Sequence, residues 1–546
     1  MEATSDAVGM PELEVRGGDE GWLATTPWWM ISAGLHLVLL LVATLFYVER
    51  FTSVDSPPIG IQYESSHGLL EDQGPSVDKF IREHLVKDDV TAPVEEHFVF
   101  DPTAALGDHI ESDDNEEFHM RKGESEKLHG YIPGGVPGIL GRTAGQSPGT
   151  TDIMGVGPGG GRSGRYGTRF GGKKNLITAY FPGGPDTESA VIAALKWLAR
   201  HQNPDGSWGA RSFSDQCVGT KCSGPGDAEH DTGVTGLSLL AFLGAGYTHL
   251  SKDEYPDPLV PGRKLRFGDA VKNGLKWLLS KQDTEGCIGS RGTKFMYNHS
   301  IAALALSEAY GMSATQLFKG PAQMAVDFVL AAQNPDRAWR YTKQPGDNDS
   351  SVTGWAIMAL KSAELSELQV PTRESYEKAK KWFDEATNPS GYYRVGYNAR
   401  ASGPVYIPGV NENFKHHESM TAVGVLCRIF MSKDKKDPTL GGVQLLVSDL
   451  PAWKPDLIDY YYWYYASLAL FQYDAPNGPY WKKWNEAMKD ALVPNQKTAK
   501  DGCANGSWTS ENERWGAEGG RVYAVAINAL TLEVYYRYPN IIGGTR

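Results

Sequence analysis

From about residue 186 onward, apolar residues recur with the spacing of α-helices, and the predicted helices come in pairs. The first helix of a pair has one apolar face, as at Ala190 and Leu198, and keeps lysine and arginine on its other side. It ends in strong turn chemistry such as Asn203-Pro204-Asp205-Gly206. The second helix, as from Val234, is apolar on nearly all sides, which is typical of a buried helix. The pattern predicts a helix–turn–loop–helix unit.

This unit recurs along the chain with a period of roughly 50 residues. Because a pair of helices cannot bury its own apolar face, the units must stack on one another. About six pairs favour a closed ring of inner helices inside a ring of outer helices, an all-α (α/α)6 toroid over residues 186–546. The turn motifs lie at 202–208, 281–286, 332–339, 388–392 and 501–508, and a further inner helix is predicted at 460–472.

The first turn motif, Gln202-Asn203-Pro204-Asp205-Gly206-Ser207-Trp208, resembles the QW motif of squalene–hopene cyclases and oxidosqualene cyclases. The Thr-Gly and Ala-Leu spacing of the second helices is similar to the prenyltransferase and squalene-oxidase repeat. The whole chain resembles bacterial membrane proteins of planctomycete type that carry this repeat. The resemblance implies a toroid like that of terpenoid cyclases and protein prenyltransferases. It leaves two functions open, a binding or scaffold module with a ligand in the central cavity, or a cyclase-like or prenyltransferase-like enzyme.

The recurring glutamine and tryptophan of the turn motif have a predicted structural role. A glutamine at the end of an outer helix, such as Gln202, can donate to carbonyls that lack a partner there. A tryptophan such as Trp208 can cover the start of the next helix. Because the motif recurs in several repeats, it is specific for the fold, and it indicates nothing about chemistry.

The sequence before the repeats predicts a membrane anchor and a tether. Residues 28–48 carry no formal charge, are flanked by aromatic residues, and are long enough to cross a bilayer core of about 30 Å as a helix. A short tail, 1–27, precedes this span, and a mixed acidic region, 49–129, that we expect to be mostly disordered follows it. The glycine-rich linker 130–185 is predicted to be flexible. We expect the toroid on the extracytoplasmic, periplasmic side of the membrane.

Composition changes this picture in two ways. The net charge of −13 argues against nucleic acid as a partner, since phosphate binding needs a basic face. The ligand expected at the mouth of the ring is a lipid, glycan or peptide. Five cysteines are too few for a disulfide scaffold. Cys217 and Cys222 share one loop that His230 follows, a pattern open to a metal site or a local disulfide. We predict the disulfide, and expect no metal and no other cofactor.

The resemblance to cyclases directs attention to the start of the third inner helix. Cyclases protonate an alkene with an aspartic acid of a DxDD motif, and that motif falls on Asp349-Ser350-Ser351-Val352. A serine therefore stands at the position of the proton donor, which disfavours a squalene-type cyclase. Asp349 also fits the N-cap of a helix. By repeat position Asp231 and His417 match the zinc-binding aspartate and histidine of prenyltransferases, but Gly233 stands where the cysteine is needed.

Polar residues at the predicted starts of the inner helices are expected to face one mouth of the ring. Histidine and carboxylate groups there can perform acid–base work or orient a ligand; alternatively, they cap helices around a water-filled funnel. The candidate catalytic residues are Asp349, Asp231, His417 and Glu418. The candidate ligand-binding residues are His230, Tyr297, His299, His416, Tyr461 and Trp463. The last two belong to an aromatic run that fits core packing equally well.

Overall fold

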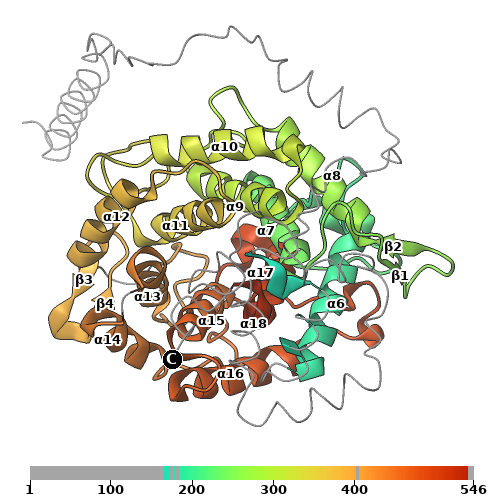
Figure 1. Cartoon of the computed structure of the whole chain (residues 1–546). Helices are drawn as coiled ribbons and strands as arrows, with labels where there is room; N and C mark the ends of the chain where they lie inside the picture. Colours follow the sequence, from blue (N-terminus) through green and yellow to red (C-terminus); the bar gives the residue numbers. More distant parts are fainter. Residues whose placement is uncertain are drawn as a thin grey trace, which may run out of the picture. The chain divides into compact units, whose positions relative to one another are not determined.

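A computed structural model describes residues 165–170, 174, 177–178, 184–400, 402, 405–433 and 435–538. Helices of this part alternate along the chain between an outer and an inner ring (Figure 1). The outer helices are α6 (Gly184–Arg200), α8 (Phe267–Ser280), α10 (Gln316–Ala331), α12 (Thr372–Ala386), α14 (Asp437–Leu446) and α16 (Pro479–Leu492). The inner helices are α7 (Asp231–Gly244), α9 (Phe295–Ser313), α11 (Ser350–Leu365), α13 (Ser419–Ser432), α15 (Tyr460–Asp474) and α17 (Gly516–Leu532).

The inner helices form a closed ring. Each packs against the inner helices that precede and follow it along the chain, and α17 packs back against α7. An outer helix covers the junction between two inner helices, as α10 does for α9 and α11. Figure 1 shows the outer helices surrounding the inner ones, with the last helix pair beside the first. The chain therefore folds as an α/α toroid, as the repeating pattern predicts.

Two short antiparallel hairpins depart from the all-helical prediction. Strand β1 (Glu254–Pro256) pairs with β2 (Lys264–Arg266), and β3 (Thr387–Asn388) pairs with β4 (Arg394–Val395). Both hairpins lie in connections between helices and leave the rings intact. The second hairpin matters for the site, because β4 packs against α13 and positions two residues at the mouth of the ring.

In the first repeat, the turn motif joins one outer helix to the next. The Gln202 side chain donates from Nε2 to the carbonyl of Gly206 in its own turn and to that of Ala270 in α8, both at 2.9 Å. Trp208 donates from its indole nitrogen to the carbonyl of Leu198 at 2.8 Å, near the end of the preceding helix α6. The glutamine thus donates to carbonyls, as predicted, but these belong to its own turn and to the next outer helix, and not to the end of its own helix. The tryptophan satisfies a carbonyl of the helix before it, which differs from the predicted cover over the next helix.

The same glutamine bond closes the ring. Gln496 follows α16 in the last repeat and donates from Nε2 to the carbonyl of Ala190 in α6, at 2.8 Å. The last outer helix is therefore tied to the first by the contact that ties neighbours elsewhere. Equivalent bonds join Gln282 to the Pro321 carbonyl at 2.9 Å and Gln333 to the Ser375 carbonyl at 3.0 Å.

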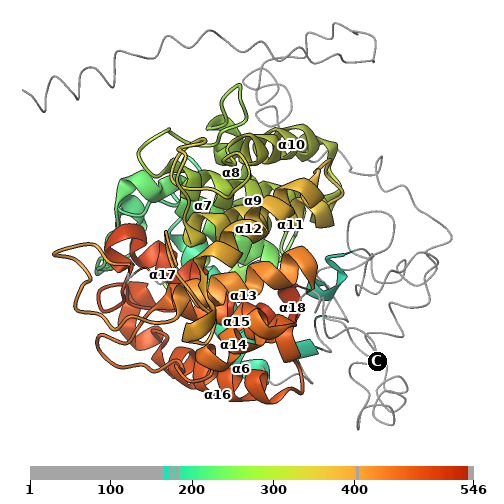
Figure 2. The same cartoon turned by 90° about the vertical axis from the view of Figure 1, so that its left-hand side faces the viewer.

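A buried ion network fills one end of the ring. Arg169 of the short helix η5 (Gly167–Arg169) and Arg537 of α18 (Val534–Arg537) both face Glu308 of α9, at 2.7 and 3.4 Å. All these side chains are fully buried. The Tyr538 hydroxyl also donates to Glu308, at 2.9 Å. Figure 2 shows α17, with long loops, toward one side of the barrel and α18 toward the other.

This network corrects one boundary. Residues 165–170 fall within the predicted flexible linker 130–185, yet Tyr166 and Arg169 are buried in the barrel. The Tyr166 hydroxyl shares a hydrogen bond with Ser366 at 2.9 Å. The prediction of a flexible tether is therefore wrong over this stretch, because aromatic and arginine side chains among the glycines give it partners in the core.

The predicted membrane span, 28–48, lies outside the described residues, and so do the tail 1–27 and the acidic region 49–129. Across the residues that the structure does describe, every helix is too short or too polar to cross a bilayer. The anchor therefore stays a prediction from the sequence.

Candidate functional site

The inner helices begin around a cavity of about 660 Å³. Cavities of roughly 300–1,000 Å³ are typical of small-molecule sites. The first turns of α7, α9, α11, α13, α15 and α17 contribute to its wall. The connection from β4 to α13 and the segment before α17 complete its rim with Arg394, Tyr397, His416 and Arg514. The inner helices therefore begin around one mouth of the ring, as the sequence predicts.

The wall of this cavity changes from polar to apolar with depth. Tyr297 lines it in the first turn of α9, and Ile301 lines it one turn further along the same face. Ser351 and Trp355 stand in the same relation on α11, and Leu237 lines the deeper part of α7. Four residues of helix correspond to about 6 Å. The charged lining side chains therefore lie at the rim, beside apolar ones such as Val405 and Ile407, and the floor about one turn below it is apolar and aromatic.

The carboxylates of the rim are already paired with cations or imidazole. Glu418 accepts from Arg394 Nε at 2.8 Å and from Arg394 Nη2 at 2.6 Å. Glu518 Oε2 lies 3.1 Å from His230 Nε2, and this hydrogen bond lowers the pKa of Glu518. Both acids are thus already bonded to partners within the protein.

The two neighbouring histidines are also engaged. His416 Nδ1 lies 2.8 Å from Arg514 Nη2, and since a guanidinium only donates, this nitrogen must accept. Burial, and then the charge of Arg514, lower the pKa of His416, so the ring is neutral. His417 has Asp449 Oδ2 at 2.8 Å from Nδ1 and the Leu457 carbonyl at 3.0 Å from Nε2. Both ring nitrogens of His417 therefore face acceptors of the protein.

Asp349 lies beneath the rim without lining the cavity. It caps α11, since Oδ1 accepts from the backbone nitrogen of Val352 at 2.7 Å. Its other oxygen lies 3.5 Å from the Tyr397 hydroxyl, which in turn bonds the hydroxyl of Tyr341. Burial raises the pKa of Asp349 to about 7. The Asp349 carboxyl group contacts Tyr397, which lines the cavity, and does not line the cavity itself. Its role in the structure is that of N-cap of α11, one of the two roles that the sequence allowed.

Four of the predicted ligand-binding residues line the cavity: His230, Tyr297, His416 and Tyr461. His299 does not, because its Nδ1 accepts from the Ile288 nitrogen at 3.1 Å and its Nε2 donates to the Ala325 carbonyl at 3.0 Å. Trp463 is fully buried against Trp453. Each is placed two residues after a lining tyrosine, which rotates the side chain by about 200° around its helix.

The predicted catalytic residues are not brought together. Among the described residues of that set, His417 and Glu418 line the cavity, whereas Asp349 and Asp231 do not. Asp231 Oδ1 accepts from the backbone nitrogen of Ala210 at 2.8 Å and so holds the preceding loop. The carboxylates of Asp231 and Asp349 thus serve the backbone at the starts of α7 and α11.

Several residues of the rim were not predicted from the sequence. Arg394 lies in the short strand β4, Tyr397 follows that strand, and Arg514 precedes α17, so none of them stands at a helix start. Glu518 does stand in the first turn of α17. The rule that selected the other helix starts, applied to the sixth repeat, finds Glu518; no comparable pattern marks the loop residues.

The predicted disulfide is not formed. Cys217 and Cys222 are free thiols, and each sulfur lies near Nε2 of His201, at 3.5 and 3.8 Å. His230, the histidine that follows them in sequence, points instead to Glu518 at the cavity. The two sulfurs thus converge on a ring nitrogen that the sequence analysis did not consider.

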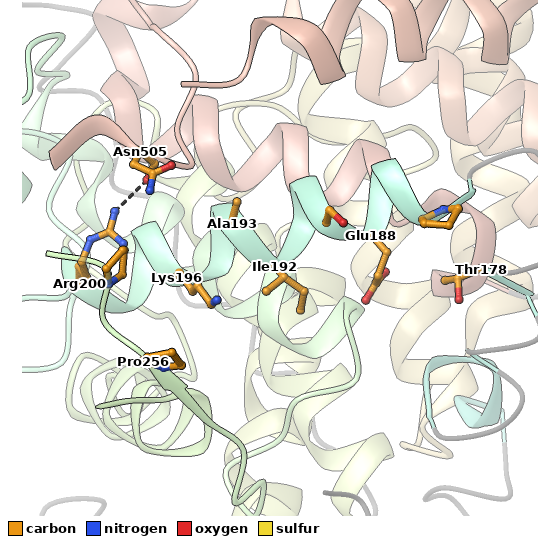
Figure 3. Close-up of a pocket in the computed structure, with 11 residues that line it drawn as sticks. Thr178, Glu188, Ile192, Ala193, Lys196, Arg200, Pro256 and Asn505 are labelled. Carbon is orange, nitrogen blue, oxygen red and sulfur yellow. Dashed lines mark hydrogen bonds between the residues drawn. The ribbon is translucent and has the colours of Figure 1, made fainter. Parts of the chain in front are cut away.

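A second hollow, of about 770 Å³, runs along the outer face of α6 (Figure 3). Ile192 and Ala193 line it, and its carboxylate, Glu188, is paired with Lys174 at 2.6 Å. Arg200 at its end donates to the Asn505 carbonyl at 2.8 Å. The cavity at the mouth of the ring is the better candidate, because the first turns of six inner helices converge on it, whereas this hollow lies along one outer helix.

No family model and no curated protein matches the sequence. Solved structures similar to the chain include an α-amylase from Clostridium perfringens, at 12% identity over 64% of this chain and 98% of that one, with a TM-score of 0.42. The GH76A α-1,6-mannanase from Salegentibacter sp. HEL1_6 has 12% identity, the same two coverages and a TM-score of 0.43. A type II terpene cyclase from Scytonema has 12% identity over 64% of this chain and 97% of that one, with a TM-score of 0.38. Likenesses at this level assign no activity to the chain.

Proposed function

We propose that the toroid is a ligand-binding module whose cavity takes an amphipathic small molecule, apolar end first. The observation that carries the proposal is the change of the wall from a polar rim to a floor of Leu237, Ile301 and Trp355. Apolar ligand surface buried on that floor is stabilised by about 25 cal/mol per Å². A hydroxyl or amide head then meets the donors and acceptors of the rim. Of the lipid, glycan and peptide ligands open from the sequence, a lipid-like molecule fits this gradient best.

The pairing of the rim supports binding over catalysis. A general base needs a free acceptor within about 3 Å of the proton that it removes. Glu418 and Glu518 each have a cation or an imidazole at 2.6–3.1 Å, and both nitrogens of His417 face acceptors. These groups are well placed to orient a polar head, and a substrate would have to displace an existing ion pair before using them as acid or base.

The module's place in the cell is part of the same proposal. The uncharged span 28–48 would anchor the chain in a membrane, with the toroid on the extracytoplasmic side. A lipid-like ligand would then be at hand in the bilayer. This part is supported by the sequence alone, and a protease-accessibility assay on membrane vesicles tests it.

Binding is tested by mass spectrometry of lipids that remain with the purified full-length protein. We expect a bound amphiphile in the wild type. The Leu237→Trp substitution puts a larger side chain on the apolar floor and should abolish its retention. Tyr392→Trp, at a position that is 74% exposed, is the matched control and should retain it. Equal retention in the two variants, or a ligand without an apolar part, would contradict the proposal.

A second function has one observation in its favour. Asp349 is buried with a pKa of about 7, as a carboxyl group that protonates an alkene would be. A cyclase-like enzyme would convert a polyisoprenoid into a cyclic product, and Asp349→Asn should abolish that turnover while leaving retention of the ligand unchanged. We expect no turnover in the wild type, because Tyr397 separates Asp349 from the cavity.

A further inference from the structure

Three thiols and one imidazole meet at the seam between the first and the last repeat. They belong to His201 at the end of α6, to Cys217 and Cys222 in the loop before α7, and to Cys503 in the short helix η10 (Ala499–Ala504). Their potential ligand atoms all lie within 4.8 Å of one another. Cys503 and His201 are 302 residues apart along the chain.

The distances match a tetrahedral zinc centre. With Zn–S near 2.3 Å and Zn–N near 2.0–2.1 Å, a sulfur and a nitrogen ligand lie about 3.6 Å apart. The three sulfurs lie 3.5, 3.8 and 3.3 Å from His201 Nε2, in the order Cys217, Cys222 and Cys503. The three sulfur–nitrogen distances therefore agree with the spacing that a single ion imposes on such ligands.

The surroundings of the ligand atoms fit the same reading. His201 Nδ1 donates to the Trp197 carbonyl at 2.7 Å, which leaves the lone pair of Nε2 for the cluster. Backbone nitrogens donate to two of the sulfurs, from Cys222 to Cys217 Sγ at 3.2 Å and from Val218 to Cys503 Sγ at 3.4 Å. Donors of this kind stabilise a thiolate, which is the form that binds a metal.

We propose that His201, Cys217, Cys222 and Cys503 bind a zinc ion that clasps the first repeat to the last. Four protein ligands fill a tetrahedral shell and leave no open position, so the site is structural. None of the four is among the residues that line the cavity at the mouth, and the proposal is independent of the ligand bound there.

The position explains what the ion does. A ring built from repeats has one junction that joins the end of the chain to its beginning, and closing it orders a loop that includes every repeat between them. At this junction Gln496 donates to Ala190, and Arg200 donates to the Asn505 carbonyl at 2.8 Å (Figure 3). A metal bound by both sides adds its binding free energy to the folded ring alone. This proposal differs from the expectation from the sequence that the protein binds no metal.

The test is metal analysis of the full-length protein purified under reducing conditions and without chelator. We expect one zinc ion per chain by inductively coupled plasma mass spectrometry. Exchange with Co²⁺ should give the intense visible absorption of a tetrahedral cobalt–thiolate centre. Cys503→Ser should lose the zinc, whereas Cys427→Ser, at a fully buried cysteine outside the cluster, should keep it. Removal of zinc by a chelator should lower the Tm of the wild type.

Three results would overturn the proposal. The first is a wild-type protein without zinc that also fails to give the cobalt absorption after metal loading. The second is full zinc content in Cys503→Ser. The third is a Cys217–Cys222 disulfide found by peptide mapping of the protein as purified. The first and third measurements need no substitution, so a variant that fails to fold does not prevent a decision.

Discussion

Replacing Glu308 by glutamine tests how much the buried ion network at the end of the ring opposite the cavity stabilises the fold. Glu308 accepts from Arg169 at 2.7 Å, lies 3.4 Å from Arg537 and accepts from the Tyr538 hydroxyl at 2.9 Å, with all charges fully buried. Glutamine keeps the size of the side chain and removes its charge. The two arginines then remain buried without their carboxylate, which is the costly way to break a buried ion pair.

The expected loss is large. Removing one partner of a buried pair typically costs about 3–5 kcal/mol. An unfolding entropy of about 2.1 cal/mol/K per residue amounts to about 0.8 kcal/mol/K over the roughly 370 residues from 165 to 538. A loss of about 4 kcal/mol therefore lowers Tm by about 5 °C.

The effect should depend on pH in a defined direction. Burial opposes ionisation of Glu308, but the charges of Arg169 and Arg537 outweigh it and lower the pKa of its carboxyl group. A lowered folded-state pKa means stability that is present above the unfolded value, about 4.3, and is lost as pH falls through the folded value. The difference in Tm between wild type and Glu308→Gln should therefore be full at pH 7 and shrink in acid.

Glu533 provides the matched control. It is equally buried, neither carboxylate oxygen has a hydrogen-bond partner, and burial raises the pKa of its carboxyl group well above the usual value. The contribution of such a group is present below its unfolded pKa and is lost as pH rises through the folded value. Glu533→Gln should leave Tm at pH 7 unchanged or raise it. Differential scanning fluorimetry at pH 7 and at a series of pH values extending below 4 makes the comparison, and equal losses in the two variants at pH 7 would refute the reasoning.

Three further predictions concern the rings. Gln333→Ala removes the bonds to the Arg337 and Ser375 carbonyls and should cost about 1–3 kcal/mol, measured by urea unfolding. Gly506→Ala should destabilise far more than Gly346→Ala: both glycines have φ near +90°, but a Cβ at Gly506 would lie 2.1 Å from the Ala193 carbonyl oxygen and one at Gly346 would meet nothing within 4 Å. Similar losses in those two would contradict the close approach. Asp349→Asn keeps a cap for α11 and should remove a decline in stability between about pH 4 and 7, because a raised folded pKa favours the fold in acid and this is lost as pH rises through about 7; thermal unfolding at pH 4.5 and 8 decides.

The fold was accessible from the sequence because its signal is repeated. Outer helices bury one face, whereas inner helices bury nearly every residue, and this difference recurs in each helix pair. Turn motifs such as that of Gln202 mark where one unit ends. Local patterns of this kind predict the repeat without any knowledge of contacts between distant residues. They also give the starts of the inner helices, and hence much of the cavity rim.

The remaining features depend on contacts between residues far apart in sequence. Cys503 comes close to His201 only in the closed ring. From the sequence alone, Cys217 and Cys222 therefore have only each other as nearby thiol partners, which favours the prediction of a local disulfide. Arg169 looks like one more cation in a glycine-rich segment until it meets Glu308. Neither residue type nor spacing nearby distinguishes these partners from solvated side chains.

The direction of the inner helices explains why the two ends of the barrel differ in charge. All the inner helices begin at the cavity, so their partially negative carboxyl ends converge on the opposite end. There two buried arginines face one ionised glutamate, and Arg169 Nη1 also lies 3.4 Å from the Leu243 carbonyl near the end of α7. The surplus cation is thus balanced by helix termini, while burial raises the pKa of Glu533 well above its usual value and so opposes a further negative charge there. At the open end the helices present amino termini, which favours a ligand head that carries acceptor oxygens.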